Sequence, residues 1–152
     1  MKKYEVKIGE ALGDIKLRMD RQEVRNILGE YKEYRGKAFG TDKLYEQDIF
    51  NNFVIGYDND NRVNFICFTN FKENTVIFDE IDVRELGSYE LFYTIYKMDQ
   101  NLDMELCGYT SNKLGIGITY EKEIILDNLE TEKVHESLES FVIASKNYWS
   151  NN

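Results

Sequence analysis

The residue types that carry most enzymatic chemistry are sparse in this chain. It has one histidine, His135, and two cysteines, Cys67 and Cys107. One histidine and two distant cysteines do not supply a usual zinc-ligand set or a nucleophile paired with a base. Each cysteine lies in an apolar, strand-like run, so we expect two buried free thiols. His135 lies in a polar, acidic stretch, where we expect an exposed structural role.

Carboxylates are abundant, with 28 aspartates and glutamates in 152 residues. A dense cluster consists of Asp79, Glu80, Asp82 and Glu85. Two carboxylates held together can act as general acid and base, or can bind a hard cation. A chain with so many acids also forms such clusters by chance. We therefore predict a solvated or partner-facing acidic patch here, with no catalytic residues and no bound metal.

Two further motifs begin like ligand-binding loops but do not complete the pattern. The run Asp58-Asn59-Asp60-Asn61-Arg62 opens like a calcium loop, yet the required glycine is Val63 and the twelfth position is Thr69. Gly115 and Gly117 lack the third glycine and the following helix of a dinucleotide site. The sequence therefore predicts a hairpin turn at the first motif and close strand packing or a bulge at the second. It predicts no cofactor.

The net charge of −9 is concentrated in the later part of the chain. Residues 1–50 carry eleven basic and ten acidic side chains, whereas residues 51–152 carry eight and eighteen. Such a surface repels phosphate, which argues against DNA, RNA and anionic membranes as partners. A basic protein is a natural partner, because opposite charges steer association. The alternative is that the acidity only keeps the protein soluble.

No stretch of the sequence reaches the roughly 20 apolar residues of a membrane span. Residues 2–7 alternate in the manner of a strand and lack the apolar run of a secretory signal. We therefore expect a soluble, cytoplasmic protein.

Two short amphipathic helices are predicted. The first covers residues 21–28, where Asp20 and Glu23 have the spacing of a capping box and Gly29 stands at the C-terminal cap position. Val24, Ile27 and Leu28 would form its apolar face. The second covers residues 88–98 after a serine cap, with apolar residues at three- and four-residue spacing.

The remaining apolar runs have the period of strands. Residues 53–57 and 63–68 form a hairpin around a four-residue turn, and residues 75–78 add a third strand. Later strands are predicted at 104–109, 114–120 and 140–144, with 127–139 as a short helix or a loop.

The order of these elements, a helix followed by antiparallel strands, occurs twice along the chain. It predicts one domain, residues 1–152, with possible pseudo-repeats 1–80 and 81–152. The expected fold class is α+β, a twisted antiparallel sheet with short helices packed on one face. The opposite face of the sheet would be free to carry function.

Three tyrosines, Tyr89, Tyr93 and Tyr96, lie off the apolar stripe of the second predicted helix. Tyrosine supplies contact area at a low entropy cost and is enriched at binding hot spots. Together with the acidic cluster before the helix, these tyrosines are the predicted partner-binding residues. The alternative is that they form a second core-facing rim of a helix buried on all sides.

Residues 14–29 resemble the opening motif of the BamE-like helix-plus-sheet superfamily. The matching residues are Ile15, Leu17, Met19, Val24, Ile27, Leu28 and Gly29. Arg18 replaces the usual glycine of this motif, and Asp20 replaces the usual threonine or serine. The superfamily includes outer-membrane assembly lipoproteins, tandem-domain β-lactamase inhibitory proteins and immunity proteins of bacterial polymorphic-toxin systems. The tandem element order and the closing run 144–149 are most similar to the immunity branch, since a lipoprotein would need a leader and a lipidated cysteine.

The resemblance implies a sheet that docks proteins and does not catalyse. The leading hypothesis is an immunity-type inhibitor that binds a cognate, basic, nuclease-like bacterial toxin through an acidic surface. The alternative is a non-catalytic structural or adaptor domain that self-associates through an exposed sheet edge. An enzyme with an unfamiliar site is the third hypothesis.

Overall fold

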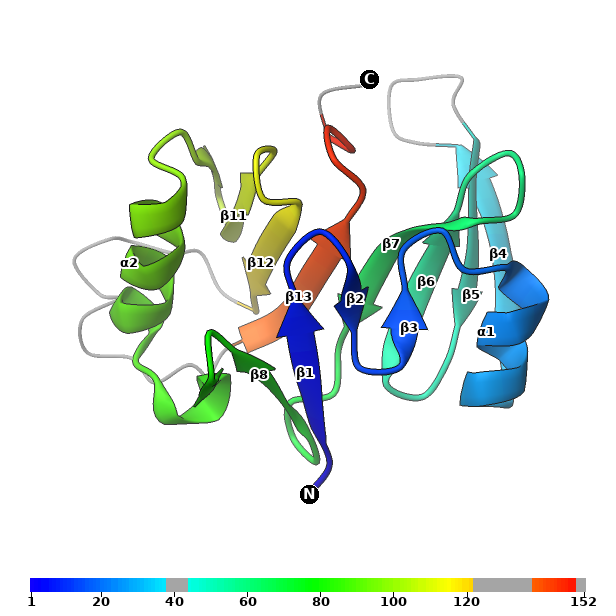
Figure 1. The fold of residues 1–152 in the computed structure, drawn as a ribbon, viewed down its shortest axis with the longest axis horizontal. Coiled ribbons are helices and arrows are strands. Elements are labelled where there is room, and N and C mark those ends of the chain that lie inside the picture. Colours follow the sequence, from blue (N-terminus) through cyan, green and yellow to red (C-terminus); the bar gives the residue numbers. More distant parts are fainter. Residues whose placement is uncertain (38–43, 122–137, 150–152) are drawn as a thin grey trace.

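The computed structural model describes residues 1–37, 44–121 and 138–149, which form two sheets and two helices (Figure 1). Helix α1 spans Arg21–Leu28 and α2 spans Ser88–Met98, with a short 3-10 turn, η1, at Val83–Glu85. The protein therefore has the expected α+β fold with short helices. None of the described helices is long and apolar enough to cross a membrane.

The larger sheet is entirely antiparallel. Its eight strands, in spatial order, are β10 (Asp103–Glu105), β11 (Gly108–Ser111), β12 (Ile116–Tyr120), β13 (Leu138–Ala144), β7 (Val63–Phe68), β6 (Phe53–Tyr57), β5 (Leu44–Ile49) and β4 (Lys32–Lys37). The centre of this sheet is the antiparallel pair of β7 and β13, where Cys67 lies opposite Val142.

The smaller sheet has five short strands. In spatial order they are β3 (Ile15–Lys16), β2 (Ala11–Leu12), β1 (Lys3–Lys7), β8 (Thr75–Phe78) and β9 (Ile81–Asp82). Strands β1 and β8 are parallel and the other pairs are antiparallel, so this sheet is mixed. The predicted strand at 75–78 is thus confirmed, but it belongs to a different sheet from the hairpin before it.

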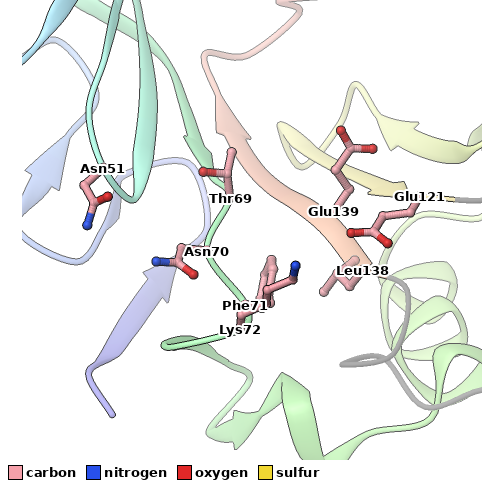
Figure 2. A pocket seen from close by; sticks show the side chains of 8 residues that line it. All are labelled: Asn51, Thr69, Asn70, Phe71, Lys72, Glu121, Leu138 and Glu139. Carbon is pink, nitrogen blue, oxygen red and sulfur yellow. The ribbon is translucent and has the colours of Figure 1, made fainter.

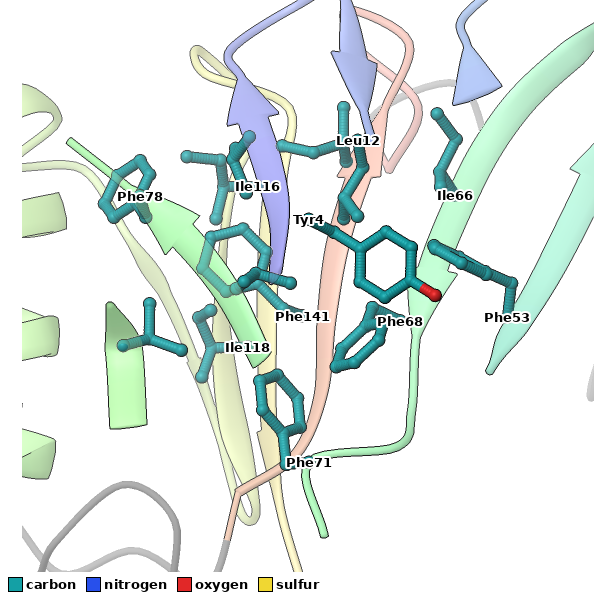
Figure 3. Packing of buried hydrophobic residues seen from close by; sticks show 14 of the residues in the cluster. Tyr4, Leu12, Phe53, Ile66, Phe68, Phe71, Phe78, Ile116, Ile118 and Phe141 are labelled. Carbon is teal, nitrogen blue, oxygen red and sulfur yellow. The ribbon is translucent and has the colours of Figure 1, made fainter. Parts of the chain in front are cut away.

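The small sheet and both helices cover one face of the large sheet (Figure 1). Aromatic side chains fill the space between the two sheets, as Figure 3 shows for Tyr4, Phe68 and Phe141. The ring of Tyr4 stands edge-on to Phe53 with centroids 5.1 Å apart, and Phe53 is likewise edge-on to Phe68 at 5.5 Å. Such edge-to-face pairs add about 0.5–1.5 kcal/mol each beyond area burial, so this cluster firmly joins the layers.

The predicted order of a helix followed by antiparallel strands recurs in the large sheet. Each half supplies a helix followed by four antiparallel strands, α1 with β4–β7 and α2 with β10–β13. The β6–β7 and β12–β13 pairs have the same stepwise register, and each shifts at its last position, at Tyr57 and at Tyr120. Both tyrosines are buried at these irregularities. The two halves meet where β7 pairs with β13.

The predicted Asp20 and Gly29 caps of α1 are present, but the capping box is not, because the described hydrogen bonds include none between the Asp20 N–H and Glu23. The Asp20 carboxylate accepts a hydrogen bond from the Gln22 backbone N–H at 3.1 Å, and Gly29 takes a positive φ of 86° while its N–H bonds to the Arg25 carbonyl. The predicted apolar face is only partly correct, because Ile27 remains 43% exposed. Arg21 and Arg25 complete the inner face of this helix.

Strands β4 and β5 were not predicted. Every residue of β4 is exposed or half-buried, and its sequence, KEYRGK, shows no apolar alternation. An edge strand of this kind is held by its backbone ladder, and its excess of basic charge discourages pairing of two β4 edges with each other. A prediction from apolar periodicity misses such strands, since their side chains carry no burial signal.

The predicted strand at 104–109 is wrong. It is divided between β10 and β11, which form a tight hairpin through Leu106 and Cys107. Leu106 is 68% exposed although it lies in an apolar run. Cys67 is buried as expected, whereas Cys107 is only half-buried in the hairpin, and both thiols are free.

The turn and glycine predictions are confirmed. Asp58 caps the β6–β7 turn by accepting hydrogen bonds from the backbone of Asp60 and Arg62. A Cβ at Gly115 would lie 2.3 Å from the Ala144 carbonyl oxygen, so close backbone packing requires glycine there. His135 and most of 127–139 lie outside the described residues.

Candidate functional site

Helix α2 carries the predicted tyrosines and is capped at its N-terminal end. The Glu90 carboxylate accepts a hydrogen bond from the Gly87 N–H at 3.0 Å, so Gly87 is the N-cap, one residue before the predicted Ser88. Leu91 and Ile95 are fully buried against the large sheet. This inner face fixes which side chains of the helix point outward.

Tyr89, Tyr93 and Tyr96 are all on the exposed side of α2, with exposed fractions of 40%, 46% and 37%. The sequence allowed two positions for these tyrosines, an exposed surface or a second core-facing rim. The structure shows that they are exposed. The Tyr89 and Tyr93 rings stack nearly parallel, 7° apart with centroids separated by 6.1 Å. These two rings form a preordered aromatic surface one helical turn long.

Neighbouring side chains support this aromatic surface. The Lys97 ammonium lies 5.1 Å from the Tyr93 ring centroid. Tyr96 stacks on Phe92 at 5.8 Å, and Phe92 stands edge-on to the buried Tyr109 at 5.3 Å. Tyr96 is thus coupled to the core through Phe92, which lowers the entropy that this ring loses when a partner covers it.

Three of the four predicted acidic residues are exposed beside this helix. Asp79 and Glu80 form the β8–β9 turn, with positive φ angles of 53° and 67°. Glu85 ends η1, the turn that leads into α2. Figure 1 shows the β8–β9 hairpin and η1 next to the N-terminal end of α2.

Asp82 differs from its three neighbours. Its carboxylate accepts hydrogen bonds from the buried Thr75 hydroxyl at 2.7 Å and from the Arg84 N–H at 3.0 Å, and lies 3.7 Å from the Lys3 ammonium. The Asp82 side chain is 11% exposed. Its predicted place in a partner-facing patch therefore conflicts with its intramolecular role as the cap of η1.

We define the acidic-tyrosine surface as the exposed members of the predicted set. These are Asp79, Glu80, Glu85, Tyr89, Tyr93 and Tyr96. Aromatic rings flanked by carboxylates can bury apolar area and attract cationic groups, without any step of bond making.

A buried ion-pair cluster beneath α1 was missed by the sequence reasoning. The fully buried Asp48 carboxylate binds Arg25 through two hydrogen bonds, Arg21 through one and the Tyr57 hydroxyl through another, at 2.8–3.0 Å. Burial acts to raise the pKa of Asp48, but these hydrogen bonds together outweigh it and lower the pKa below its ordinary value. All oxygens of Asp48 are occupied, so this cluster is a structural joint between α1 and β5.

The only sequence signal for this cluster was the pair Arg21 and Arg25, four positions apart on one side of α1. Because charged side chains are expected on the solvent face of a helix, the sequence did not predict that these two point inward. The guanidinium of Arg21 lies 4.5 Å from the Tyr57 ring centroid, and that of Arg25 lies 4.0 Å from the Tyr31 ring centroid.

A polar pocket of about 370 Å³ lies between the end of β7 and the start of β13. Figure 2 shows Glu121 and Glu139 on one side of it and Asn51 on the other, with Lys72 between them. Two carboxylates and an amine are common catalytic groups, but residues 122–137 follow Glu121 directly and lie outside the described residues. We assign no chemistry to this pocket.

The face of the large sheet opposite α1 and α2 carries a second apolar cluster. Cys67, Val142 and Ala144 are buried there by Phe65, Tyr148 and Trp149. Burial raises the pKa of the Cys67 thiol to about 11, so this cysteine is a neutral thiol at physiological pH. Within the described ranges, no group of three histidine, cysteine or acidic side chains is placed to hold a metal ion.

Comparison of the chain with protein-family models, with curated proteins and with solved structures gave no match. The resemblance to BamE-like proteins stays a prediction. The geometry and charge of the described residues are therefore the basis for assigning a function.

Proposed function

We propose that the protein is a non-catalytic, cytoplasmic inhibitor that binds a protein partner through the acidic-tyrosine surface. The observation that carries this proposal is the outward row of Tyr89, Tyr93 and Tyr96, each between 37% and 46% exposed. Large rings held in one orientation at the surface are typical of binding hot spots, because little side-chain freedom is lost on contact.

The charge around these rings indicates the chemistry of the partner. Asp79, Glu80 and Glu85 are exposed on the elements just before α2, and the whole chain carries a net charge of −9. A basic surface is attracted to such a region and approaches it faster than diffusion alone allows. A toxin that cleaves nucleic acid has a basic substrate cleft, so an immunity protein for a nuclease-like toxin fits this pattern.

Growth rescue tests the proposal directly. Bacteria that express a basic toxin domain encoded beside this chain's gene should stop growing, and coexpression of the chain should restore growth through a one-to-one complex. Failure to protect the cells, together with separate elution of the two purified proteins, would reject the immunity function.

Charge reversal locates the docking surface. Changing Asp79, Glu80 and Glu85 to lysine should slow association with the toxin at least about tenfold at low salt and flatten its salt dependence. A control with the same change in net charge reverses Glu23, Glu30 and Asp60, which are also exposed but lie on α1, just after it and in the β6–β7 turn.

The control variant should retain the steep salt dependence of the original chain. Equal effects of the two triple variants would mean that only net charge matters, and would remove the acidic-tyrosine surface from the proposal.

Truncation of a single ring tests the short-range contact. The variant Tyr93→Ala should weaken the complex by about 2 kcal/mol, mostly through faster dissociation. Tyr34→Ala is a matched control, because Tyr34 is 51% exposed on β4, far from α2 in the sheet order. Indistinguishable dissociation rates for the two variants would argue against a tyrosine contact.

A second candidate function is self-association through the edges of the large sheet. Among the described strands, β4 and β10 are the two edges. The β4 edge carries three basic residues and one acid, whereas β10 carries Asp103 and Glu105 without a basic residue. Opposite charges on the two edges would favour head-to-tail pairing of copies. A mass that stays monomeric by light scattering across a wide concentration range would exclude this function.

A further inference from the structure

A small pocket opens on the face of the large sheet opposite α2. It has a volume of about 190 Å³, below the roughly 300 Å³ at which pockets for drug-sized ligands begin. Phe65 and Trp149 supply its aromatic walls, and Gly117 and Val142 supply its apolar base. A space of this size suits one inserted side chain.

The aromatic wall is built by the end of the described chain folding back over the sheet. The Ser145 N–H bonds to the Asn64 carbonyl at 2.9 Å and starts a turn that places Tyr148 against Phe65, with ring centroids 5.3 Å apart. Trp149 then stands edge-on to Tyr148 at 5.6 Å. The position of the indole is therefore fixed before any ligand arrives.

Gly117 makes room for this indole. A Cβ at Gly117 would lie 3.0 Å from Cζ2 of Trp149 and 3.4 Å from the Val142 side chain. The equivalent position in the first half of the sheet, by strand register, is Val54. Because Gly117 has no side chain, Trp149 can approach the backbone of β12 and form the pocket. In the first half of the sheet, the side chain of Val54 stands at the equivalent position.

The polar groups of the pocket select the charge of its occupant. Glu105 is the only formally charged side chain in the lining, and it makes no ion pair within the part of the chain that the structure describes. The hydroxyls of Thr119 and Ser140 bond to each other, and each keeps oxygen lone pairs that can accept further hydrogen bonds. Carboxylate, hydroxyls and ring faces all favour a cation with several donors.

We propose that this pocket receives the side chain of an arginine from a protein partner. The planar guanidinium can stack on the indole of Trp149 while its N–H groups donate to Glu105 and to the hydroxyls behind it. A lysine ammonium has no plane to stack and is more strongly hydrated, so it fits less well. The pocket lies on the face opposite the acidic-tyrosine surface and its occupation does not depend on that surface.

Trp149 is the only tryptophan of the chain, so its fluorescence and its single indole N–H signal in NMR spectra report on this pocket. The probe is blocked arginine, N-acetyl-arginine methylamide, titrated at constant ionic strength. Blocked citrulline is the matched ligand, because it has the same shape without the charge. Blocked leucine tests for an apolar occupant.

We expect saturable binding of blocked arginine in the millimolar range and at least about tenfold weaker binding of blocked citrulline and blocked leucine. The variant Glu105→Gln should reduce arginine binding to the level of citrulline. Asp103→Asn is the control, since it removes one negative charge from the same exposed edge strand without lining the pocket.

Equal binding of arginine and citrulline, tighter binding of leucine, or equal effects of the two β10 variants would overturn the proposal. So would the absence of any saturable change. Circular dichroism of both variants verifies that they are folded. Because no toxin is used, failure here is separate from failure of the inhibitor function.

Discussion

Arg25 and Asp48 form a bidentate ion pair that docks α1 onto the large sheet, with Nε 2.8 Å from Oδ2 and Nη2 3.0 Å from Oδ1. By strand register, the position of Asp48 in the first half corresponds to Tyr109 in the second. There the helix docks through aromatic contact between Phe92 and Tyr109. The two halves therefore attach equivalent helices by different chemistry.

Removing the charge of Asp48 should strongly destabilise the protein. The variant Asp48→Asn removes the buried carboxylate between the two guanidinium groups, whose other ion-pair partners, Glu46 and Glu33, are 35% and 62% exposed. We expect a loss of about 3 kcal/mol in the free energy of unfolding. Glu46→Gln is the control, because Glu46 is 35% exposed and lies 3.6 Å from Arg21, so its loss should cost below about 1 kcal/mol. Urea unfolding followed by circular dichroism measures both, and similar losses would contradict the joint described here.

Stability should fall in acid because of Asp48 and Asp99. Hydrogen bonds hold the pKa of Asp48 below its ordinary value against the effect of burial, and the Ser111 hydroxyl at 2.6 Å lowers the pKa of Asp99. As the pH falls, both carboxylates bind protons near pH 4 in the unfolded chain but only at lower pH in the folded protein. Acid therefore favours the unfolded state. The stabilisation is complete above about pH 4 and is lost as the pH falls through the lower folded-state pKa values.

Unfolding free energies measured between pH 2 and pH 6 test this dependence. The slope below about pH 4 should be positive, meaning greater stability at higher pH. Asp48→Asn should reduce that slope. A variant with an unchanged slope would show that Asp48 does not contribute to acid sensitivity.

Comparing Gly115 with Gly9 distinguishes the cost of backbone strain from the cost of a steric clash when glycine is replaced by alanine. Both have a positive φ, 68° and 72°, but a Cβ at Gly9 meets nothing within 4 Å, whereas one at Gly115 lies 2.3 Å from the Ala144 oxygen. Gly9→Ala should cost about 1 kcal/mol from backbone strain alone. Gly115→Ala should cost about 2–4 kcal/mol, because β13 must also shift. Equal thermal shifts for the two variants would contradict this close approach.

Asp82 and Asp79 test whether neighbouring acids have different roles. Asp82→Ala removes the cap of η1 and a hydrogen bond of the buried Thr75, so the unfolding free energy should fall by about 1–2 kcal/mol. Asp79→Asn should change stability by below about 0.5 kcal/mol, since asparagine tolerates the positive φ of 53° at that turn. Comparable losses would mean that Asp79 is structural too.

The sequence by itself determined the elements whose signals are local. Asp20 and Gly29 delimit α1 because a carboxylate cap and a left-handed glycine act within one helical turn. The hairpin around Asp58 follows from period-two apolar runs and a turn residue that bonds its own neighbours. The sequence left two alternatives for Tyr93, an exposed position or a second core-facing rim, and the spacing of Leu91 and Ile95 did not decide between them.

Only the tertiary structure decided the features that join distant residues. The inward direction of Arg25 depends on Asp48, 23 positions later, and no local pattern shows that a charged side chain will have such a partner. Asp82 became a cap instead of a docking residue because Thr75 and Lys3 converge on it from two other strands. Which side chains are buried, and which distant residues they contact, depends on how the sheets and helices pack. A periodicity along the chain therefore cannot predict these contacts.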